Sequence, residues 1–342
     1  MMGIPKAMAI LLLAGATECL GQDPHFSQFF MAPHFVNPAN VGTQYGSWTM
    51  MGNFRQQWGN AGTLFQTQTL AAEAKLTGLE DDMNTLAFGM SFMNDQSMMG
   101  SFRSNYASAT VAYHIQLADN HRLGAGFQGS YCNRRIDFSN LSFGQQFTGD
   151  GFDLAIPTGE TSIRDLAPFF SMGAGVMYTY STHDLSVDAG IALYDINRPV
   201  QSFLDRNNRL EPRYAYKLNM EYFTRGSVLI NLHNIYHRQT TQNYFAVGGS
   251  LGLAVSPGTW DRIIYAGGWF REGDSFFPYA GVQINDIRIG ISYDITYSEQ
   301  NRGPGNPRSL EMSVMYSKAR RNKSIPGCRI PSRFLQRNTI LR

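Results

Sequence analysis

Apolar and polar residues alternate along much of the chain between Tyr45 and Tyr316. In the stretch 287–297, with the sequence IRIGISYDITY, every odd position is apolar or aromatic and every even position is small, polar or charged. Because successive side chains of a strand point to opposite faces, this stretch has one apolar and one polar face. Similar runs predict about 14 strands: 46–57, 63–76, 84–93, 105–117, 121–132, 168–180, 183–194, 213–223, 227–237, 243–255, 261–271, 277–285, 286–297 and 309–317.

The links between the predicted strands differ in length in a regular way. Those after the fourth, sixth, eighth and twelfth strands span a few residues, whereas those after the third, fifth, seventh and thirteenth are long. The longest runs from Asn133 to Ala167. Membrane barrels turn their apolar face to lipid and have short periplasmic turns and longer external loops. We therefore expect an all-β, transmembrane antiparallel β-barrel over 45–317. The alternative, a secreted β-sandwich, does not predict that short links follow even-numbered strands and long links follow odd-numbered ones.

Composition agrees with a barrel. Charged residues make up 16% of the chain, against roughly 25% in ordinary soluble domains. Aromatic residues reach 13% and there are 34 glycines. The mean hydropathy of −0.25 excludes a helical membrane bundle. Aromatic residues near strand ends predict interfacial girdles, although aromatics favour any strand: Trp48, Trp58, Tyr178, Tyr180, Tyr236, Trp269 and Tyr297.

The N-terminus has the pattern of a secretory signal peptide. Lys6 supplies a positive charge, 7–16 is a short apolar stretch, and small residues follow. We expect cleavage after Gly21, which makes 1–21 the signal peptide. A lipoprotein would use Cys19, but Thr17 and Glu18 are a poor approach to such a site.

The C-terminal stretch 318–342 is strongly basic. It carries eight Lys or Arg and no acid, and with Lys6 these account for 9 of the 28 basic residues. The remaining 19 basic residues face 25 acids once Glu18 is set aside, so the barrel is mildly acidic and the tail is basic. We expect both termini in the periplasm, where Arg320, Arg321 and Lys323 bind acidic partners or anionic lipid; a merely solvated tail is the alternative.

Three motifs of enzymes or metal sites occur, and each is better explained by a strand. The sequence GAGFQG at 124–129 matches a dinucleotide fingerprint, and GGSLG at 248–252 matches a nucleophile elbow, but both motifs need a helix to follow. His233 and His237 fall on the polar face of one strand without an evident third ligand. We expect no catalytic site, metal or cofactor, and Cys132 and Cys328 as free thiols.

The mature start carries the most specific motif. Residues 22–43 read QDPHFSQFFMAPHFVNPANVGT, and 54–58 read FRQQW. Both stretches resemble the PorP/SprF family of outer-membrane barrels of the type IX secretion system, as do 269–274 (WFREGD) and 290–295 (GISYDI). His34 and Phe35 depart from the family pattern, and the long loop after Asn133 has no recognised counterpart.

The resemblance implies a non-enzymatic role in protein export and surface anchoring at the outer membrane. Its implied partners are periplasmic ring proteins, an OmpA-like peptidoglycan-binding protein, and cargo with a C-terminal sorting domain or a gliding adhesin. Outer-membrane lipid is a further partner, and no nucleic acid is expected. The alternative is a small-molecule porin or a transport barrel for hydrophobic compounds, although the predicted lumen is rich in glycine and small polar residues, which suggests a filled or narrow interior.

Residues 22–44 form, in this interpretation, a periplasmic or lumenal segment. Its prolines break helices and strands, and its phenylalanines form an apolar stripe too large to stay in water. It forms an ordered plug that packs into the barrel or docks a partner; the alternative is a simple N-terminal cap that closes the base of the barrel. The candidate partner-binding residues are Asp23, Pro24, Phe26, Phe29, Phe30, Asn37 and Pro38, together with Arg320, Arg321 and Lys323 of the tail.

Overall fold

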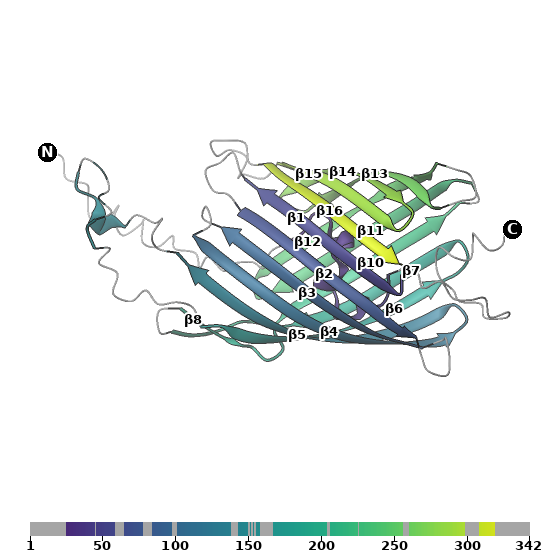
Figure 1. Cartoon of the computed structure of the whole chain (residues 1–342), viewed down its shortest axis with the longest axis horizontal. Helices are drawn as coiled ribbons and strands as arrows, with labels where there is room; N and C mark the ends of the chain where they lie inside the picture. The colour runs from purple at the N-terminus through teal and green to yellow at the C-terminus, as the bar shows by residue number, and fades with distance from the viewer. Residues whose placement is uncertain are drawn as a thin grey trace.

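The chain folds into a closed barrel of 14 antiparallel strands, shown in Figure 1. The computed structural model describes residues 25–44, 46–58, 65–77, 84–97, 101–137, 143–149, 151, 153, 155–157, 167–203, 206–224, 226–255, 260–297 and 308–318. The strands of the barrel are β1 (Trp48–Gln57), β2 (Phe65–Thr77), β3 (Thr85–Ser97), β4 (Phe102–Ala118), β5 (His121–Ile136), β6 (Phe169–Ser181), β7 (Leu185–Tyr194), β10 (Arg213–Phe223), β11 (Val228–Gln239), β12 (Gln242–Ala254), β13 (Arg262–Arg271), β14 (Ser275–Ile284), β15 (Ile287–Thr296) and β16 (Arg308–Lys318).

Each strand pairs with its neighbours in chain order, and the barrel closes where the first strand meets the last. Trp48 of β1 lies opposite Ala74 of β2 on one side and opposite Lys318 of β16 on the other. Closure leaves no unpaired sheet edge, which is the condition for a sheet to span a membrane. The predicted fold class, including the number of strands, is confirmed.

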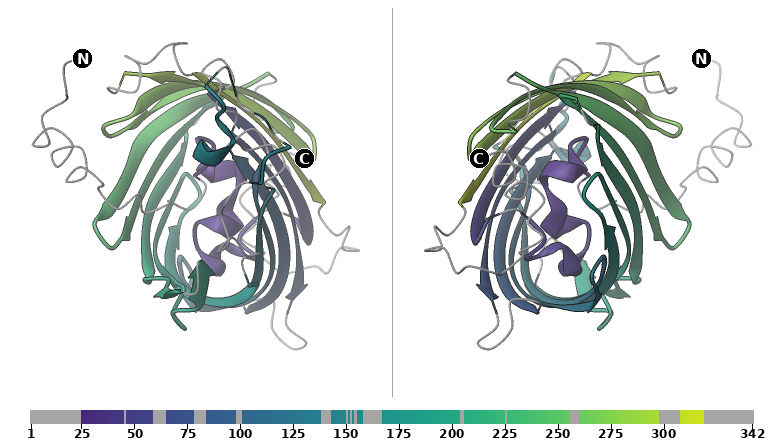
Figure 2. Two further views of the ribbon diagram at one scale, coloured as in Figure 1. Left: turned by 90° about the vertical axis from the view of Figure 1, so that its left-hand side faces the viewer. Right: turned by 90° about the vertical axis from the view of Figure 1, so that its right-hand side faces the viewer.

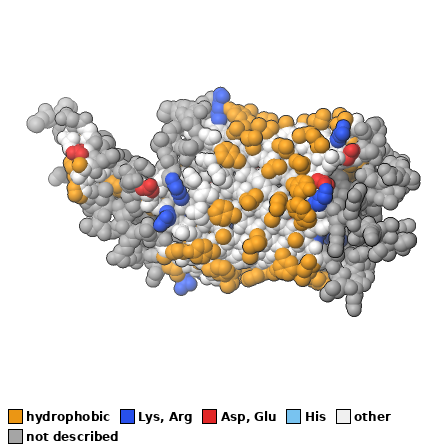
Figure 3. All heavy atoms as spheres, viewed as in Figure 1, with side chains coloured by type: hydrophobic (Ala, Val, Ile, Leu, Met, Phe, Trp, Pro, Cys, Tyr) orange, Lys and Arg blue, Asp and Glu red, His pale blue; other side chains and the backbone are white. Residues whose placement is uncertain are grey.

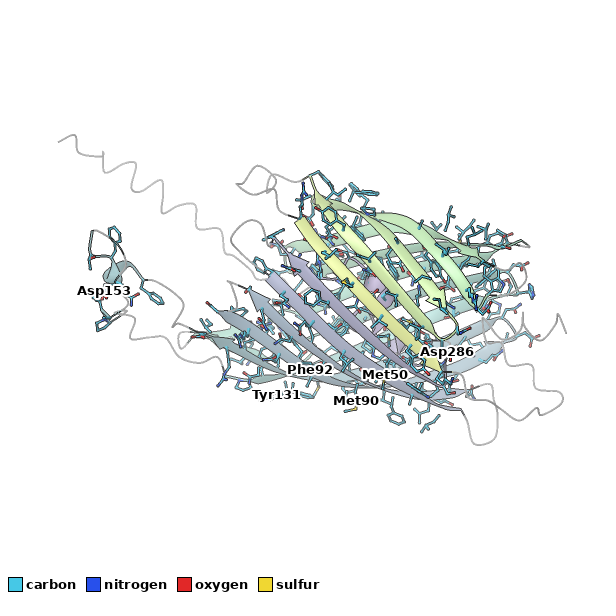
Figure 4. All side chains as sticks on the ribbon, turned by 45° about the horizontal axis from the view of Figure 1, so that its top comes forward. Met50, Met90, Phe92, Tyr131, Asp153 and Asp286 are labelled. Carbon is cyan, nitrogen blue, oxygen red and sulfur yellow. The ribbon has the colours of Figure 1, made fainter. Side chains whose placement is uncertain are left out.

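The outer face of the barrel is apolar and the inner face is largely polar. On β15, Ile287, Ile289 and Ile291 are exposed, while Ser292 and Asp294 are buried. Figure 3 shows hydrophobic side chains spread over the face of the barrel turned to the viewer, and Figure 4 labels Met50, Met90, Phe92 and Tyr131, exposed residues of β1, β3 and β5. This is the inverse of a soluble core and suits lipid as the surrounding solvent.

Several strands extend further than the sequence pattern indicated. β3 continues to Ser97, β4 starts at Phe102 and β5 continues to Ile136. Polar residues occupy both faces of these extensions, so the alternation that predicts a lipid-facing strand is absent there. Pairing continues nevertheless, with Asn94 Nδ2 donating to Asn105 Oδ1 at 2.7 Å across β3 and β4.

The link between β7 and β10 contains a short hairpin that the sequence did not predict. It consists of β8 (Val200–Phe203) and β9 (Arg206–Arg209), which form a separate two-stranded sheet. This link and the one between β5 and β6, which contains the one-turn 3₁₀-helix η6 (Gly144–Gln146), are the longest in the barrel. Both lie at the end where β1 finishes, so by the rule for outer-membrane barrels this end is external.

No helix among the described residues is long and apolar enough to cross a membrane.

The predicted aromatic girdle is wrong for Trp269. Trp48, Tyr178 and Tyr297 are exposed on the outer face, whereas the side chain of Trp269 is fully buried and faces the lumen. Strand β13 carries large apolar residues on both faces, with Tyr265 and Trp269 inside and Ile264 and Phe270 outside. Alternation alone cannot show which face of such a strand meets lipid.

Candidate functional site

Residues 25–44, here called the lumenal segment, lie inside the barrel. Figure 2 shows this segment, in purple, within the ring of strands. It contains three single-turn 3₁₀-helices, η1 (Phe29–Met31), η2 (Pro33–Phe35) and η3 (Pro38–Asn40). Proline is the first residue of η2 and of η3, where its missing N–H is not needed. Nearly every side chain from 26 to 42 is buried, so the segment fills space that water would otherwise occupy.

The first anchor of the segment is made by Ser27 and Gln28. Their backbone N–H groups donate to the two carboxylate oxygens of Glu311, at 2.7 and 3.0 Å respectively. The Ser27 hydroxyl donates to Asp294 at 2.8 Å and accepts from Arg271 Nη2 at 2.8 Å. We call Ser27, Gln28, Arg55, Arg271, Asp294 and Glu311 the outer anchor.

The outer anchor contains two guanidinium groups and two carboxylates, all buried. Arg55 Nη2 donates to Asp294 at 2.9 Å, and Arg55 Nε lies 3.7 Å from Glu311. Arg271 contacts Asp294 at 3.3 Å and also Asp274 at 2.6 Å. Buried charges are tolerated only when they are paired and hydrogen-bonded, and removing one partner typically costs about 3–5 kcal/mol. The segment completes this network, because its own donors occupy the Glu311 oxygens.

An aromatic stack lies below the outer anchor. The Phe30 ring lies nearly parallel to the rings of His233 and Trp269, with centroid distances of 4.9 and 4.5 Å and interplanar angles of 9° and 15°, and the His233 and Trp269 rings lie 5.9 Å from each other. Tyr279 meets Phe30 edge-on at 5.2 Å. These contacts explain why a large apolar residue such as Trp269 faces the lumen: its partner is the segment and not lipid.

The second anchor of the segment, which we call the inner anchor, is the turn from Asn37 to Ala39. Asn37 Oδ1 caps η3 by accepting from Ala39 N at 2.8 Å, and Asn37 Nδ2 donates to Val176 O and Ile191 O at 3.1 and 3.2 Å. Three glycines of the wall allow the turn this close. A Cβ on Gly175 would lie 2.1 Å from Asn37 Oδ1, a Cβ on Gly190 2.9 Å from Asn37 Nδ2, and a Cβ on Gly126 2.4 Å from the carbonyl carbon of Pro38.

On either side of the inner anchor in sequence, the segment is held by Glu73 of β2. This buried carboxylate lies 2.9 Å from His34 Nε2 and accepts from Gly42 N at 3.0 Å. Gly42 has a φ of +85°, a left-handed conformation that favours glycine, and a Cβ there would lie 2.4 Å from the Cβ of Ala87. His114 Nε2 lies 2.8 Å from Val41 O.

The segment runs from the external end of the barrel toward the periplasmic end. Its first described residue, His25, lies with its ring 4.3 Å from the Tyr244 ring and 5.8 Å from the His237 ring. Both partners flank the β11–β12 turn, at the end where the long links lie. Its last residues approach the start of β1, because Lys75, near the other end of β2, donates to Gln44 O. The sequence predicts a periplasmic N-terminus, whereas His25 lies at the opposite end of the barrel.

The structure places the candidate partner-binding residues in different surroundings. Phe26, Phe29, Asn37 and Pro38 are buried against the barrel wall, and Phe30 is partly buried in the aromatic stack. Asp23, Pro24, Arg320, Arg321 and Lys323 lie outside the described residues. Partner binding by any of these residues stays a prediction.

Sequence reasoning missed four residues of the outer anchor: Arg55, Arg271, Asp294 and Glu311. Arg55, Arg271 and Asp294 fell within the stretches that carry the family resemblance, but no role followed from their positions. The available signal was a charged residue on the polar face of an otherwise alternating strand. Such a residue faces the lumen, where a buried charge needs a partner.

The motifs interpreted as strand features do lie in strands. The stretch 124–129 is within β5 and 248–252 is within β12, so neither opens a helix. Gly126 serves the close approach of the segment, as described above. His233 stacks on Phe30, and Cys132 is buried.

Fold and lumen together define a membrane barrel whose interior is occupied by its own N-terminal segment. Comparison with protein families gives the particular family. The sequence model described as "Type IX secretion system membrane protein PorP/SprF" matches residues 19–316. The chain therefore belongs to the PorP/SprF family, as the stretch 22–43 predicted, and is an outer-membrane β-barrel protein of that secretion system. A comparison with curated proteins gave no match.

Solved structures with a similar fold include two transport proteins and a related homologue. The TodX deltaS2S3 mutant monoaromatic hydrocarbon channel has a TM-score of 0.50 at 13% identity, covering 84% of this chain and 94% of that one. The Pseudomonas putida toluene transporter TodX has a TM-score of 0.48 at 10% identity, covering 86% and 94%. A Pseudomonas aeruginosa FadL homologue has a TM-score of 0.48 at 10% sequence identity, covering 84% of this chain and 94% of that one. At these identities the likeness is one of fold alone.

Proposed function

We propose that this protein is a non-enzymatic barrel of the type IX secretion system that acts in secretion or surface anchoring of cargo. The cargo would carry a C-terminal sorting domain or be a surface adhesin. In this proposal the barrel also docks periplasmic machinery, namely ring proteins and an OmpA-like peptidoglycan-binding protein. Membership of the family supports this role.

The observation that carries the proposal is the lumenal segment. Its residues Ser27, Gln28 and Asn37 belong to the stretch 22–43 that carries the family resemblance, and their polar groups bond to the barrel wall. A lumen filled in this way suits a scaffold in the membrane better than an open route for solutes. Partners would then bind at the two ends of the barrel and not in its interior.

Two ends of the chain are the proposed contact points for partners. The basic tail continues from β16, which ends at the periplasmic side, so Arg320, Arg321 and Lys323 would meet acidic ring components or inner-leaflet lipid. We propose an external location for the mature N-terminus, in place of the periplasmic one expected from the sequence, because His25 lies beside Tyr244 at the external end.

The test is affinity purification of the tagged protein from detergent-solubilised outer membranes, followed by mass spectrometry. We expect ring proteins, an OmpA-like protein or sorting-domain cargo to co-purify. The triple variant Arg320→Gln, Arg321→Gln, Lys323→Gln should reduce recovery of the periplasmic partners at low salt. As a matched control, Arg103→Gln, Arg238→Gln and Arg308→Gln together remove the same charge from exposed positions at the external end and should leave recovery unchanged.

Recovery of the barrel alone from the solubilised outer membranes would contradict the export role. It would favour the alternative of a transport barrel, which the similar solved structures match in fold. Deletion of 24–40 tests whether the lumenal segment itself takes part in docking partners. A folded deletion variant that still captures all partners would show that the segment has no part in docking.

A further inference from the structure

A groove lies on the outer face of β14, β15 and β16, next to the turn that joins β14 to β15. Its apolar lining consists of Val282, Ile284, Ile287, Ile289 and Tyr316, of which the four aliphatic residues are exposed. The turn residue Asp286, labelled in Figure 4, also lines it. This turn lies at the end of the barrel opposite the long links, so the groove faces the periplasmic leaflet of the membrane.

Interfacial aromatic residues show how the groove is oriented in the membrane. The ring of Trp48, exposed at the start of β1, lies edge-on to the Tyr316 ring at a centroid distance of 5.1 Å. Such aromatic residues at the ends of lipid-facing strands sit at the level of the lipid headgroups. Val282 and Ile289 lie opposite each other, two residues further from the turn than Ile284 and Ile287. The groove therefore has its polar end at the headgroups and its apolar part deeper in the membrane.

An arginine stands beside the groove without a protein partner. Arg262 is the first residue of β13 and lies opposite Ile284 of β14. Side chains opposite each other on one face of a sheet have Cβ atoms about 5 Å apart. The Arg262 side chain is exposed, and it makes no hydrogen bond or ion pair with another described residue. An arginine at the membrane surface is a favourable partner for a lipid phosphate.

The polar end of the groove also carries a carboxylate. Asp286 is partly exposed, and Lys318 Nζ lies 3.1 Å from its Oδ2. An exposed ion pair of this kind contributes little to stability, and a carboxylate has lone pairs for further donors. Arg262 and Asp286 thus offer a cation for a phosphate and an anion for an ammonium group.

We propose that this groove binds a phospholipid of the periplasmic leaflet that has an amine headgroup. The phosphate accepts from Arg262, the ammonium group donates to Asp286, and one acyl chain lies along Ile284, Ile287 and Ile289. The occupant is a lipid because the groove is continuous with the apolar outer face of the barrel, and both charges of the headgroup have a counterpart. The site is distinct from the basic tail and from the secretion role, so it can fail while both stand.

The test is native mass spectrometry of the purified, detergent-solubilised full-length protein with added lipid. The probes share palmitoyl and oleoyl chains. They are a phosphatidylethanolamine, a phosphatidylglycerol that lacks the amine, and a diacylglycerol that lacks the phosphate. We expect phosphatidylethanolamine to bind about threefold more tightly than phosphatidylglycerol, and diacylglycerol to bind most weakly.

Three variants assign the contacts. Arg262→Gln should weaken binding of both phospholipids about fivefold and leave diacylglycerol binding unchanged. Asp286→Asn should remove the preference for phosphatidylethanolamine over phosphatidylglycerol. Val282→Trp fills the groove and should weaken binding of all three lipids.

Each variant has a matched control away from the groove: Arg308→Gln, Asp119→Asn and Val247→Trp. All three replace exposed residues and should leave lipid binding unchanged, as should the triple variant of the basic tail. Should Arg262→Gln fail to fold, the pair Val282→Trp and Val247→Trp still decides whether the groove is the site. Phosphatidylglycerol or diacylglycerol bound as tightly as phosphatidylethanolamine, or binding indifferent to Val282→Trp, would overturn the proposal.

Discussion

The backbone N–H of Ser27 donates to Glu311 Oε2 at 2.7 Å across a sequence separation of 284 residues. Glu311 lies on β16, which pairs with β1, so this contact joins the lumenal segment to the seam where the barrel closes. Arg55 of β1 is opposite Glu311 across that seam and contributes a second interaction, with its Nε 3.7 Å from the carboxylate. The segment and the closed barrel therefore stabilise each other.

Replacement of Glu311 by glutamine should destabilise the barrel. One of its two carboxylate oxygens would become an N–H₂ group that faces the backbone N–H of Ser27 or Gln28, and Arg55 would lose a neutralising charge. We expect a loss of about 3 kcal/mol. The loss of stability is measured by heating samples to increasing temperatures before gel electrophoresis and recording the temperature at which the folded, fast-migrating form disappears. Glu272→Gln serves as the control, because Glu272 is an exposed carboxylate at the same, external end of the barrel; this variant should not shift the transition temperature. An unchanged midpoint in Glu311→Gln would contradict the role given to the outer anchor.

The glycine wall of the inner anchor predicts a coupled pair of variants. Gly175→Ala places a methyl group where Asn37 Oδ1 lies, 2.1 Å away, and should displace η3 and expose the segment to protease. Asn37→Ala removes that atom, so the double variant should lose less stability than the sum of the single ones, by about 1 kcal/mol or more. Gly52→Ala is the control, because its Cβ would meet Val314 at an ordinary 3.4 Å. Strict additivity of Gly175→Ala and Asn37→Ala would show that the clash does not occur.

Truncation of Phe30 should loosen the aromatic stack. Phe30→Ala removes the ring that packs against both His233 and Trp269 and should cost about 2 kcal/mol, less than for a fully buried phenylalanine because Phe30 is only partly buried. Tryptophan fluorescence should shift to longer wavelength as water reaches Trp269. Phe92→Ala, an outward-facing truncation of the same size, should leave the emission unchanged. Identical spectra for wild type and Phe30→Ala would refute the stack.

The direction of the lumenal segment predicts where an epitope can be reached. An epitope inserted after Gln22 should bind antibody in intact cells, since it lies within three residues of His25, at most about 10 Å of extended chain. An epitope after Arg342 should bind only once the outer membrane is opened. Labelling of the first epitope only after permeabilisation would place residue 22 in the periplasm and reverse the proposed direction of the segment.

Much of the architecture could be predicted from the sequence, because alternation in a lipid-facing strand is a local property. Runs such as 287–297 contain the full information about which face meets lipid. Strand ends beyond the lipid belt could not be predicted in this way, and Asn94 and Gln96 continue β3 although both faces there are polar.

The site was less accessible to sequence reasoning, because its contacts are distant in the chain. Each strand shows only that Arg55, Asp294 or Glu311 faces inward; the partner of each depends on barrel closure and on the path of the segment. Trp269 illustrates the same limit. Its burial follows from the Phe30 ring, and no pattern within β13 indicates that partner.

The measurement that tests the central claim most directly is the current through single barrels of the wild-type protein in a planar lipid bilayer. A lumen occupied by residues 26–42 and held at both anchors should give no steady open-channel current at low voltage. Glu311→Gln and Gly175→Ala should each add transient openings as the segment loosens. A steady, ohmic current through the wild-type barrel would show that the segment does not close the lumen, and it would contradict the account of this protein as a closed scaffold.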